Sequence, residues 1–297
     1  MFHARKNSVL SLATLLLLLI AFRGTAWRSK SIACCPAPEP VAQASANPTL
    51  TDSSAPKPSG EFRFYSHKSN RKRTRIATRR LERNEQVLRD AAAEFADQLN
   101  WSQDIDIAFE DCREGSDAFY DDETHKITIC REIVDEFYQL FSLERMKSAK
   151  LNQKVKGALV SLFFHELSHA LIDMFQLPIT GREEDAADQL SAILLINRTA
   201  HDAAMVLSAA EGFRLLARLE RNEQPIYWDE HSLHAQRYYD MVCLVYGSDK
   251  QRFAYLVKSG ALPEERSEIC AEDYERIRKS WTTLLQPYAK NSLWVQK

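Results

Sequence analysis

Hydrophobic residues in most of this chain recur at the spacing of α-helices. From about residue 84 onward, apolar positions lie three or four residues apart, beginning with Val87, Leu88, Ala91, Phe95 and Leu99. Such spacing predicts a helix with one apolar face. The same pattern predicts further helices over residues 131–147, 152–176, 183–197, 200–221, 231–246, 249–259 and 271–286.

A short region between the first two helices has the pattern of β-strands instead. Ile105, Ile107 and Phe109 alternate with polar residues, and Ala118-Phe119-Tyr120 is separated by an acidic turn from Lys126-Ile127-Thr128-Ile129-Cys130. Alternation of this kind predicts strands with one buried face. We therefore expect an α+β fold, mainly α with a small β-sheet at its N-terminal side.

The start of the chain lacks both patterns. An apolar run at 9–22 follows two basic residues and precedes Gly24-Thr25-Ala26. This run is shorter than the roughly 18–20 residues of a membrane-spanning helix, so residues 1–26 are expected to be a secretory signal peptide, with an uncleaved N-terminal anchor as the alternative. Residues 27–60 are rich in Pro, Ala and Ser and are expected to form a disordered linker.

Charge is distributed unevenly, although the net charge is only -2. Residues 61–83 contain nine Lys/Arg and two Glu, whereas residues 84–297 contain 24 Lys/Arg and 37 Asp/Glu. We interpret 61–83 as a basic neck before an acidic domain at 84–297. The neck is expected to be a solvated charge run, with contact to an anionic membrane surface as the alternative. Nucleic acid is not expected as a partner.

Six cysteines are consistent with an exported chain. Cys112, Cys130, Cys243 and Cys270 lie in the acidic domain, and these four allow three disulfide connectivities. The local pairs Cys112–Cys130 and Cys243–Cys270 are our preferred hypothesis. In a cytosolic protein, four buried thiols would be the better interpretation. We expect an exported protein, periplasmic or extracellular, with membrane anchoring through the N-terminal apolar segment as a variant.

One predicted helix contains the sequence His165-Glu166-Leu167-Ser168-His169. Histidines at positions i and i+4 lie on the same helix face, so both imidazoles can bind one ion. The glutamate between them is then placed to act as a general base. This HExxH motif is typical of zinc sites. It predicts Zn²⁺ held by His165 and His169, with Glu166 as a catalytic residue.

Acidic residues that follow the motif can complete the site. Glu184 lies 15 residues after His169, far enough for the chain to reverse, and is the predicted third ligand, with Glu183 as its competitor. Asp188 lies one turn after Glu184 and is predicted to orient a ligand imidazole. Asp173, at i+4 from His169, has the same predicted role, the alternative being a position near the helix end.

These motifs resemble known families. HELSHALID followed by EEDAAD is similar to the HExxH…ExxxD pattern of gluzincins, such as thermolysin-like and CAAX-type membrane peptidases. FYDDETHKITIC, FFHELSHALIDMFQLPITGREEDAADQLSAILL, WDEHSLHAQRYYDMVCLVYGSD and LPEERSEIC together resemble a bacterial family described as "putative metallopeptidases", over roughly residues 84–286. The resemblance implies a zincin-like fold with a metal site, and together with the predicted signal peptide it leads us to expect a protein of the bacterial cell envelope. It implies Glu184 as a metal ligand and Asp188 as its support. By analogy with zincins, the strand ending at Cys130 would be the sheet edge where a peptide could add as a further strand.

The reaction also needs a hydrogen-bond donor for the oxyanion that forms at the substrate. His231, which has acidic neighbours, is the candidate catalytic residue for this role, the alternative being a structural role at a helix start. The sequence thus predicts a zinc-dependent peptidase acting on peptides or proteins, with Glu166 as the base. The alternative is a non-catalytic, zinc-containing module that binds a partner.

Overall fold

The computed structural model describes residues 60–66, 69, 71–112, 117–198 and 202–291. The predicted signal peptide and all of the predicted linker except Gly60 lie outside the described residues. Within the described part of the chain, no helix is long and apolar enough to cross a membrane.

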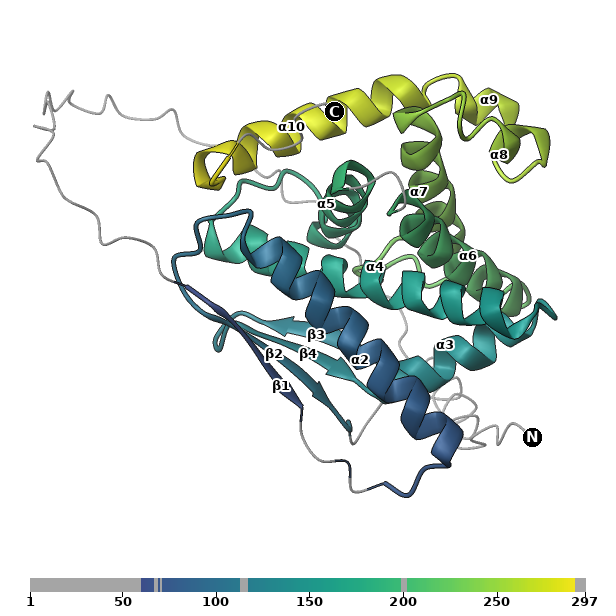
Figure 1. The fold of residues 1–297 in the computed structure, drawn as a ribbon. Coiled ribbons are helices and arrows are strands. Elements are labelled where there is room, and N and C mark those ends of the chain that lie inside the picture. Colours follow the sequence, from purple (N-terminus) through teal and green to yellow (C-terminus); the bar gives the residue numbers. More distant parts are fainter. Residues whose placement is uncertain (1–59, 67–68, 70, 113–116, 199–201, 292–297) are drawn as a thin grey trace, which may run out of the picture. The chain divides into compact units, whose positions relative to one another are not determined.

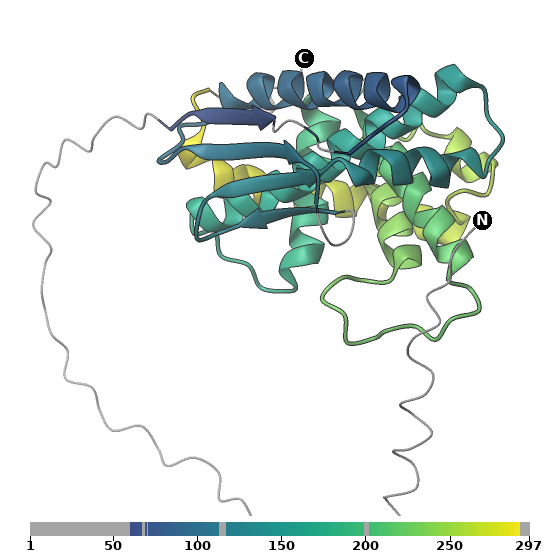
Figure 2. The same ribbon diagram turned by 90° about the horizontal axis from the view of Figure 1, so that it is seen from below.

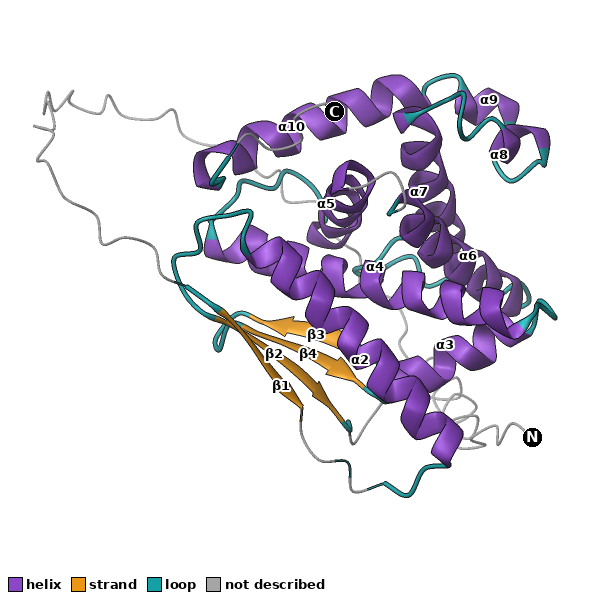
Figure 3. Cartoon of the chain, viewed as in Figure 1, coloured by secondary structure: helices purple, strands orange, loops and turns teal. Residues whose placement is uncertain are grey.

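Four strands among the described residues form one sheet in the order β1-β2-β4-β3. They are β1 (Phe62–Ser66), β2 (Ile105–Glu110), β3 (Ala118–Asp121) and β4 (Lys126–Cys130). Strands β1, β2 and β4 run parallel, whereas β3 pairs with β4 in the antiparallel direction. The helices lie on one face of the sheet (Figures 1 and 3), and the buried side chains of β2 and β4 include Ile107 and Ile127.

The expected position of β4 at the sheet edge is wrong. Strand β4 lies between β2 and β3, and β3 is the edge strand (Figure 2). Strands β3 and β4 form a hairpin, and β4 pairs in parallel with β2 along its other side. Because each strand has only two sides, this pairing leaves β3 at the edge.

The helices follow the predicted pattern closely. They are α2 (Arg75–Ala96), α3 (Glu132–Ser142), α4 (Ser148–Met174), α5 (Glu183–Arg198), α6 (Ala203–Leu219), α7 (His234–Ser248), α8 (Tyr255–Lys258), α9 (Glu264–Ser267) and α10 (Cys270–Leu285), followed by a 3₁₀ turn at Gln286–Tyr288. The helix expected over 249–259 is reduced to α8. The chain forms turns over residues 250–254, and the side chain of Asp249 accepts hydrogen bonds from the backbone N–H groups of Gln251 and Arg252, as an N-cap residue does.

Helix α4 is the centre of the domain. It contacts α2, α3, α5, α6 and β3 (Figure 1), and it is therefore buried around most of its circumference. Gly157 permits the close approach of α6, because a methyl group there would lie 2.6 Å from Ser208 Oγ. A helix packed on so many sides holds its polar residues in fixed positions, and α4 carries the HExxH motif.

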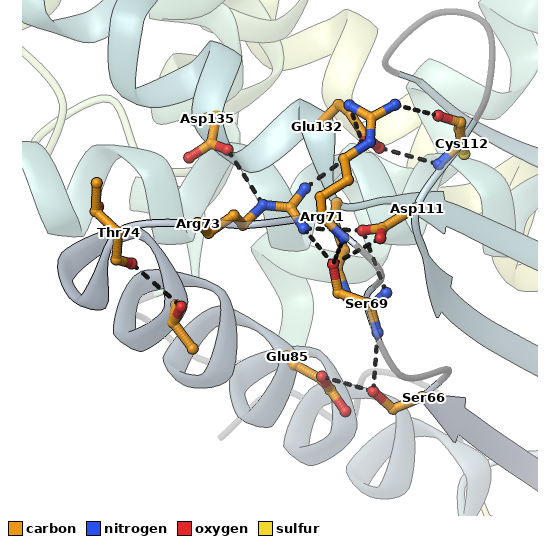
Figure 4. A network of polar contacts seen from close by, with 12 residues as sticks. Ser66, Ser69, Arg71, Arg73, Thr74, Glu85, Asp111, Cys112, Glu132 and Asp135 are labelled. Carbon is orange, nitrogen blue, oxygen red and sulfur yellow. Dashed lines mark hydrogen bonds and ion pairs between the residues drawn. The ribbon is translucent and has the colours of Figure 1, made fainter.

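The segment expected to be a solvated basic neck contributes to the fold. Strand β1 pairs with β2, and α2 begins at Arg75 after the N-cap Thr74. Arg73 is largely buried, where it lies 2.9 Å from Asp111 and 3.4 Å from Glu132 (Figure 4). Arg131 lies 3.4 Å from the same Asp111 oxygen. Arg73 of the neck thus has acidic partners just after β2 and on α3, which a count of charges along the sequence does not reveal.

Removing the Asp111 carboxylate should lower stability at neutral pH but not in strong acid. Burial raises the pKa of Asp111, but the hydroxyl of Ser69 and the guanidinium groups of Arg73 and Arg131 lower it to about 2. A lowered pKa contributes stability that is present above the unfolded value of 3.8 and is lost as the pH falls toward 2. We expect Asp111→Asn to cost about 1–3 kcal/mol at pH 7. In thermal melts from pH 7 to pH 3, the difference in melting temperature between the variant and wild type should become smaller. A difference that stays constant over this range would contradict the stabilising role of the Asp111 carboxylate.

Both predicted disulfides are confirmed. Cys112 is bonded to Cys130, and Cys243 is bonded to Cys270. The first bridge joins the segment after β2 to the end of β4, and the second joins α7 to the start of α10. Each bridge therefore links elements that are neighbours in space, as expected for local pairs.

Candidate active site

The turn between α4 and α5 brings the two predicted halves of the site together. Helix α4 ends at Met174, and Gln176 adopts a left-handed backbone conformation (φ 47°) that turns the chain away from the helix axis. The chain re-enters a helix at Glu183. Glu184 lies in the first turn of α5, where the positive end of the helix dipole favours a carboxylate.

Three polar atoms converge between these helices. His165 Nε2 lies 3.0 Å from Glu184 Oε2 and 3.3 Å from His169 Nε2, and His169 Nε2 lies 3.5 Å from the same Glu184 oxygen. Two imidazole nitrogens and one carboxylate oxygen are a donor set that binds divalent transition metals. The structure therefore brings together the three residues predicted as ligands in an arrangement that fits one ion.

Each ligand imidazole also has a carboxylate at its other nitrogen. His165 Nδ1 lies 2.9 Å from Asp188 Oδ1, and His169 Nδ1 lies 2.8 Å from Glu183 Oε1. A carboxylate hydrogen-bonded to Nδ1, as Glu183 is to His169, holds the proton there and leaves Nε2 free to bind an ion. At His165 the Asp188 oxygen is at ion-pair distance from Nδ1 but without hydrogen-bond geometry. Glu183 and Glu184 thus contact opposite nitrogens of His169, with Glu183 at Nδ1 and Glu184 near Nε2.

Arg237 of α7 is a part of the site that sequence reasoning missed. It donates two hydrogen bonds to Asp188, from Nε to Oδ2 at 2.6 Å and from Nη2 to Oδ1 at 2.8 Å. Asp188 is therefore held on both sides, by Arg237 and by His165. The two residues are 49 positions apart in sequence and on different helices, so no local spacing could have indicated the pair.

The charged side chains of this group shift one another's pKa values strongly. Burial lowers the pKa of His165, but the carboxylates of Asp188 and Glu184 outweigh this effect and raise the pKa to about 10. Burial raises the pKa of Glu184, but hydrogen bonds with three histidines hold it well below its usual range. The pKa of Asp188 is about 2 because its contacts with His165 and Arg237 outweigh burial.

Glu166 has a different environment from the other carboxylates. Its side chain is buried, lines the cavity beside the ligands and has no hydrogen-bond partner among the described residues. Burial raises the pKa of Glu166, while the nearby ligand histidines oppose the rise. A buried carboxylate without partners that faces a cavity can accept a proton from a bound molecule.

His231 reaches the site from the loop between α6 and α7. Its Nε2 lies 2.9 Å from Glu184 Oε2, and its Nδ1 lies 3.3 Å from Asp229 Oδ1. One polar atom each of His165, Glu184 and His231 lie within 4.8 Å of one another, so His231 could also contact an ion at this place. Helix α7 begins three residues later, at His234, and its N-cap is Leu233. His231 therefore does not cap the helix, which was the alternative role considered for it.

Asp173 does not join the ligand group. Its Oδ2 accepts a hydrogen bond of 2.8 Å from the hydroxyl of Tyr120 on β3 and lies 3.5 Å from His125 Nδ1. The expectation that Asp173 orients a ligand imidazole is not matched, because it lies one turn beyond His169 and faces the β3–β4 hairpin. Its contact joins the edge strand to the helix that carries the motif.

One large cavity opens at these residues. Its volume is about 1190 Å³, and its lining includes the histidines of the motif, Glu166, Glu184 and His231 together with β3. A space of this size admits a molecule far larger than an ion or a water. The residues that sequence reasoning connected with chemistry, Asp173 and Glu183 included, all line this cavity.

A comparison with protein families gives one match. Residues 65–285 fit the model of a family described as "putative metallopeptidase". No curated protein and no solved structure matches the chain. A metallopeptidase family implies a peptidase and a bound metal, in agreement with the donor set between α4 and α5. The match covers more than half of the chain and includes every residue of the site, so the chain belongs to this family of putative metallopeptidases.

Proposed function

We propose that the protein is a zinc-dependent peptidase in which His165, His169 and Glu184 hold the ion and Glu166 is the general base. The observation that carries the proposal is the convergence of three ligand atoms beside a buried carboxylate without partners. Ligand atoms about 2.0–2.1 Å from a tetrahedral zinc ion are about 3.3 Å apart. The observed separations of 3.0–3.5 Å match this value.

The residues around the ion have separate tasks. Zinc, when bound, polarises a substrate carbonyl and lowers the pKa of a water molecule. The Glu166 carboxylate accepts the proton of the attacking water and transfers it to the leaving amine. His231 donates from Nε2 to the oxyanion, and Asp229 orients the ring at Nδ1. Asp188 and Glu183 keep the protons of the ligand imidazoles at Nδ1.

The edge strand β3 is the proposed position of the peptide substrate. Among the described residues β3 has a neighbour on one side only, and it lines the cavity together with Glu166. An extended peptide can pair with such an edge through main-chain hydrogen bonds. An edge strand beside the HExxH helix also supports a zincin-like fold.

Metal content and peptide cleavage together test this function. Purified protein should contain one zinc per chain by elemental analysis. A chelator should abolish cleavage of a peptide library, followed by mass spectrometry, and added zinc should restore it. A protein without zinc contradicts the proposal. Zinc without any cleavage favours the alternative, a module that binds a partner.

We also propose that the protein acts outside the cytosol. Two disulfides in a domain of this size support the proposal, because such bonds persist mainly in oxidising compartments. Fractionation of cells that express the full chain tests it. Recovery from the cytosol with four free thiols in the domain is the contrary result.

Stability should depend on pH differently with and without the metal. The pKa of His165, raised to about 10, contributes stability that is present below the unfolded value of 6.5 and is lost as the pH rises toward 10. The metal-free protein should therefore become less stable from pH 6 to pH 9. Bound zinc needs unprotonated Nε2 atoms, so its affinity rises over the same range. Thermal melts should show that the difference in melting temperature between the zinc-loaded and the metal-free protein increases with pH. A difference that decreases with pH contradicts the assignment of His165 as a metal ligand.

A further inference from the structure

The charged residues that line the cavity beside the proposed zinc site indicate which kind of substrate can bind there. Eleven carboxylates line it within the described residues, against the two guanidinium groups of Arg221 and Arg237 and four histidines, of which His165 and His169 are proposed to bind the metal as neutral rings. Arg237 is committed to Asp188, and a zinc ion would add only two positive charges. The cavity therefore keeps a marked negative charge when the metal is bound.

Seven of these carboxylates have a proposed role or a contact with another side chain. Glu166 is the proposed base, and six others contact residues of the site or its surroundings: Glu184 and Asp188 with His165, Glu183 with His169, Asp173 with Tyr120, Glu220 with His234, and Asp229 with His231. The remaining four, Asp117, Asp122, Glu223 and Glu230, have no ion-pair partner within the described part of the chain. Side chains of this kind are available to a ligand.

The four carboxylates without ion pairs lie along two sides of the cavity. Asp117 and Asp122 flank the edge strand β3, directly before and after it. Glu223 and Glu230 belong to the loop between α6 and α7, the same loop that carries His231. Figure 2 shows this loop, in light green, on the same side of the molecule as β3. A peptide paired with β3 would therefore have carboxylates on both sides.

The inner part of the cavity is apolar. Three helices each present a stripe of hydrophobic residues to it, and these half-buried side chains include Phe137 and Leu140 of α3, Leu162 of α4, and Phe213 and Leu216 of α6. Leu162 lies one turn before Glu166 on the same face of α4. The apolar wall thus begins one helical turn from the proposed base, and small Ala209 on α6 leaves space between the larger side chains.

We propose that the substrates are basic peptides in which a large apolar residue lies between positively charged ones. The apolar side chain occupies the space between α3, α4 and α6, and the flanking Lys or Arg side chains lie near the carboxylates of β3 and the α6–α7 loop. This inference rests on the proposed peptidase function and adds the substrate class. The carboxylates of the cavity are not the only support for this substrate class. The apolar wall and the buried Glu166 carboxylate, which faces the same cavity, point to a bound peptide independently.

Four matched peptides test the proposal. Each contains one central residue, Phe or Ala, with either Arg or Glu on both sides. Cleavage is measured as kcat/KM with zinc-loaded wild type, and binding of the intact peptides is measured by fluorescence anisotropy with zinc-loaded Glu166→Gln. We expect the Phe peptide with Arg flanks to be favoured by about tenfold over its Ala counterpart and by about tenfold over its Glu-flanked counterpart. The second preference should decrease at high salt.

Substitutions assign each preference to its part of the cavity. Ala209→Phe fills the apolar space and should reduce the ratio of Phe to Ala peptides. The double variant Glu223→Lys, Glu230→Lys should remove the preference for Arg flanks. The control is Glu265→Lys, Glu268→Lys, which changes the net charge equally at exposed residues outside the cavity and should keep that preference. Circular dichroism and thermal melts verify that each variant is folded.

The binding measurements separate this proposal from the proposed function. Preferential binding of the Arg-flanked Phe peptide supports the substrate class even if wild type cleaves nothing, in which case the peptidase proposal fails. Cleavage without either preference overturns the substrate class and leaves the peptidase proposal standing. Absence of both binding and cleavage overturns the two together.

Discussion

Replacing Glu166 by glutamine is expected to reduce peptide hydrolysis by about 10²–10⁴-fold, the usual contribution of a general acid–base residue. The substitution preserves the shape and removes only the ability to accept a proton. Because Glu166 has no hydrogen-bond partner among the described residues, no structural contact is lost with its charge. The fold and the metal content should therefore stay at the wild-type level.

The assay compares kcat/KM for one fluorogenic peptide with zinc content and melting temperature measured on the same preparations. Glu166→Asp is a useful companion, because it keeps a carboxylate but withdraws it by one methylene from the cavity. It should regain part of the activity that glutamine removes. If glutamine leaves kcat/KM unchanged at full zinc occupancy, Glu166 is not the base, and the hydrolysis uses another proton acceptor.

The central part of the site was predictable because its signals are local in sequence. Histidines at i and i+4 share a helix face whatever the rest of the fold does, and Glu184 and Asp188 stand one turn apart on the next helix. Only the reversal of the chain between the helices had to be assumed, and the Pro- and Gly-containing turn indicates it. The structure places His165, His169 and Glu184 together accordingly.

Other parts depend on contacts that sequence spacing does not encode. The partner of Asp173 is Tyr120, 53 residues away on the edge strand, and the partner of Asp188 is Arg237 on α7. Helical spacing correctly placed Asp173 on the ligand face, but the β3–β4 hairpin covers that end of the face. Asp173 is on the same face of α4 as His169. It lies one turn further along the helix axis, however, and there its neighbour is Tyr120 and not a histidine of the motif.

The basic segment before α2 illustrates a limit of charge counting. Nine Lys/Arg within residues 61–83 indicated a solvated run. In the fold, Arg73 is largely buried against Asp111 and Glu132, and five residues of the segment form β1. Opposite charges just after β2 and on α3 make this burial favourable, because a charge inside a protein is tolerated when it is paired. A local excess of charge therefore does not show that a segment is outside the domain.

Glu184 and Glu183 provide the sharpest test of the metal site, because they are adjacent in sequence and have different predicted roles. Glu184→Ala should abolish zinc binding and activity together, since it removes one of three ligand atoms. The loss should also leave His165 and His231 without the carboxylate that each contacts. Glu183→Ala removes only the partner of His169 Nδ1 and should weaken zinc binding by about 10–100-fold, the usual effect of losing a group that orients a ligand.

The two variants are compared by zinc titration against a chromophoric chelator, followed by cleavage assays at saturating zinc. At saturation Glu183→Ala should recover most of its activity, because its ligand set is complete, whereas Glu184→Ala should not. Equal zinc affinities in the two variants would mean that Glu183 also supplies a ligand atom. The reverse order would assign the third ligand to Glu183, in conflict with the 2.8 Å contact between Glu183 Oε1 and His169 Nδ1. Glu184 is the expected ligand because its Oε2 lies within 3.5 Å of both Nε2 atoms.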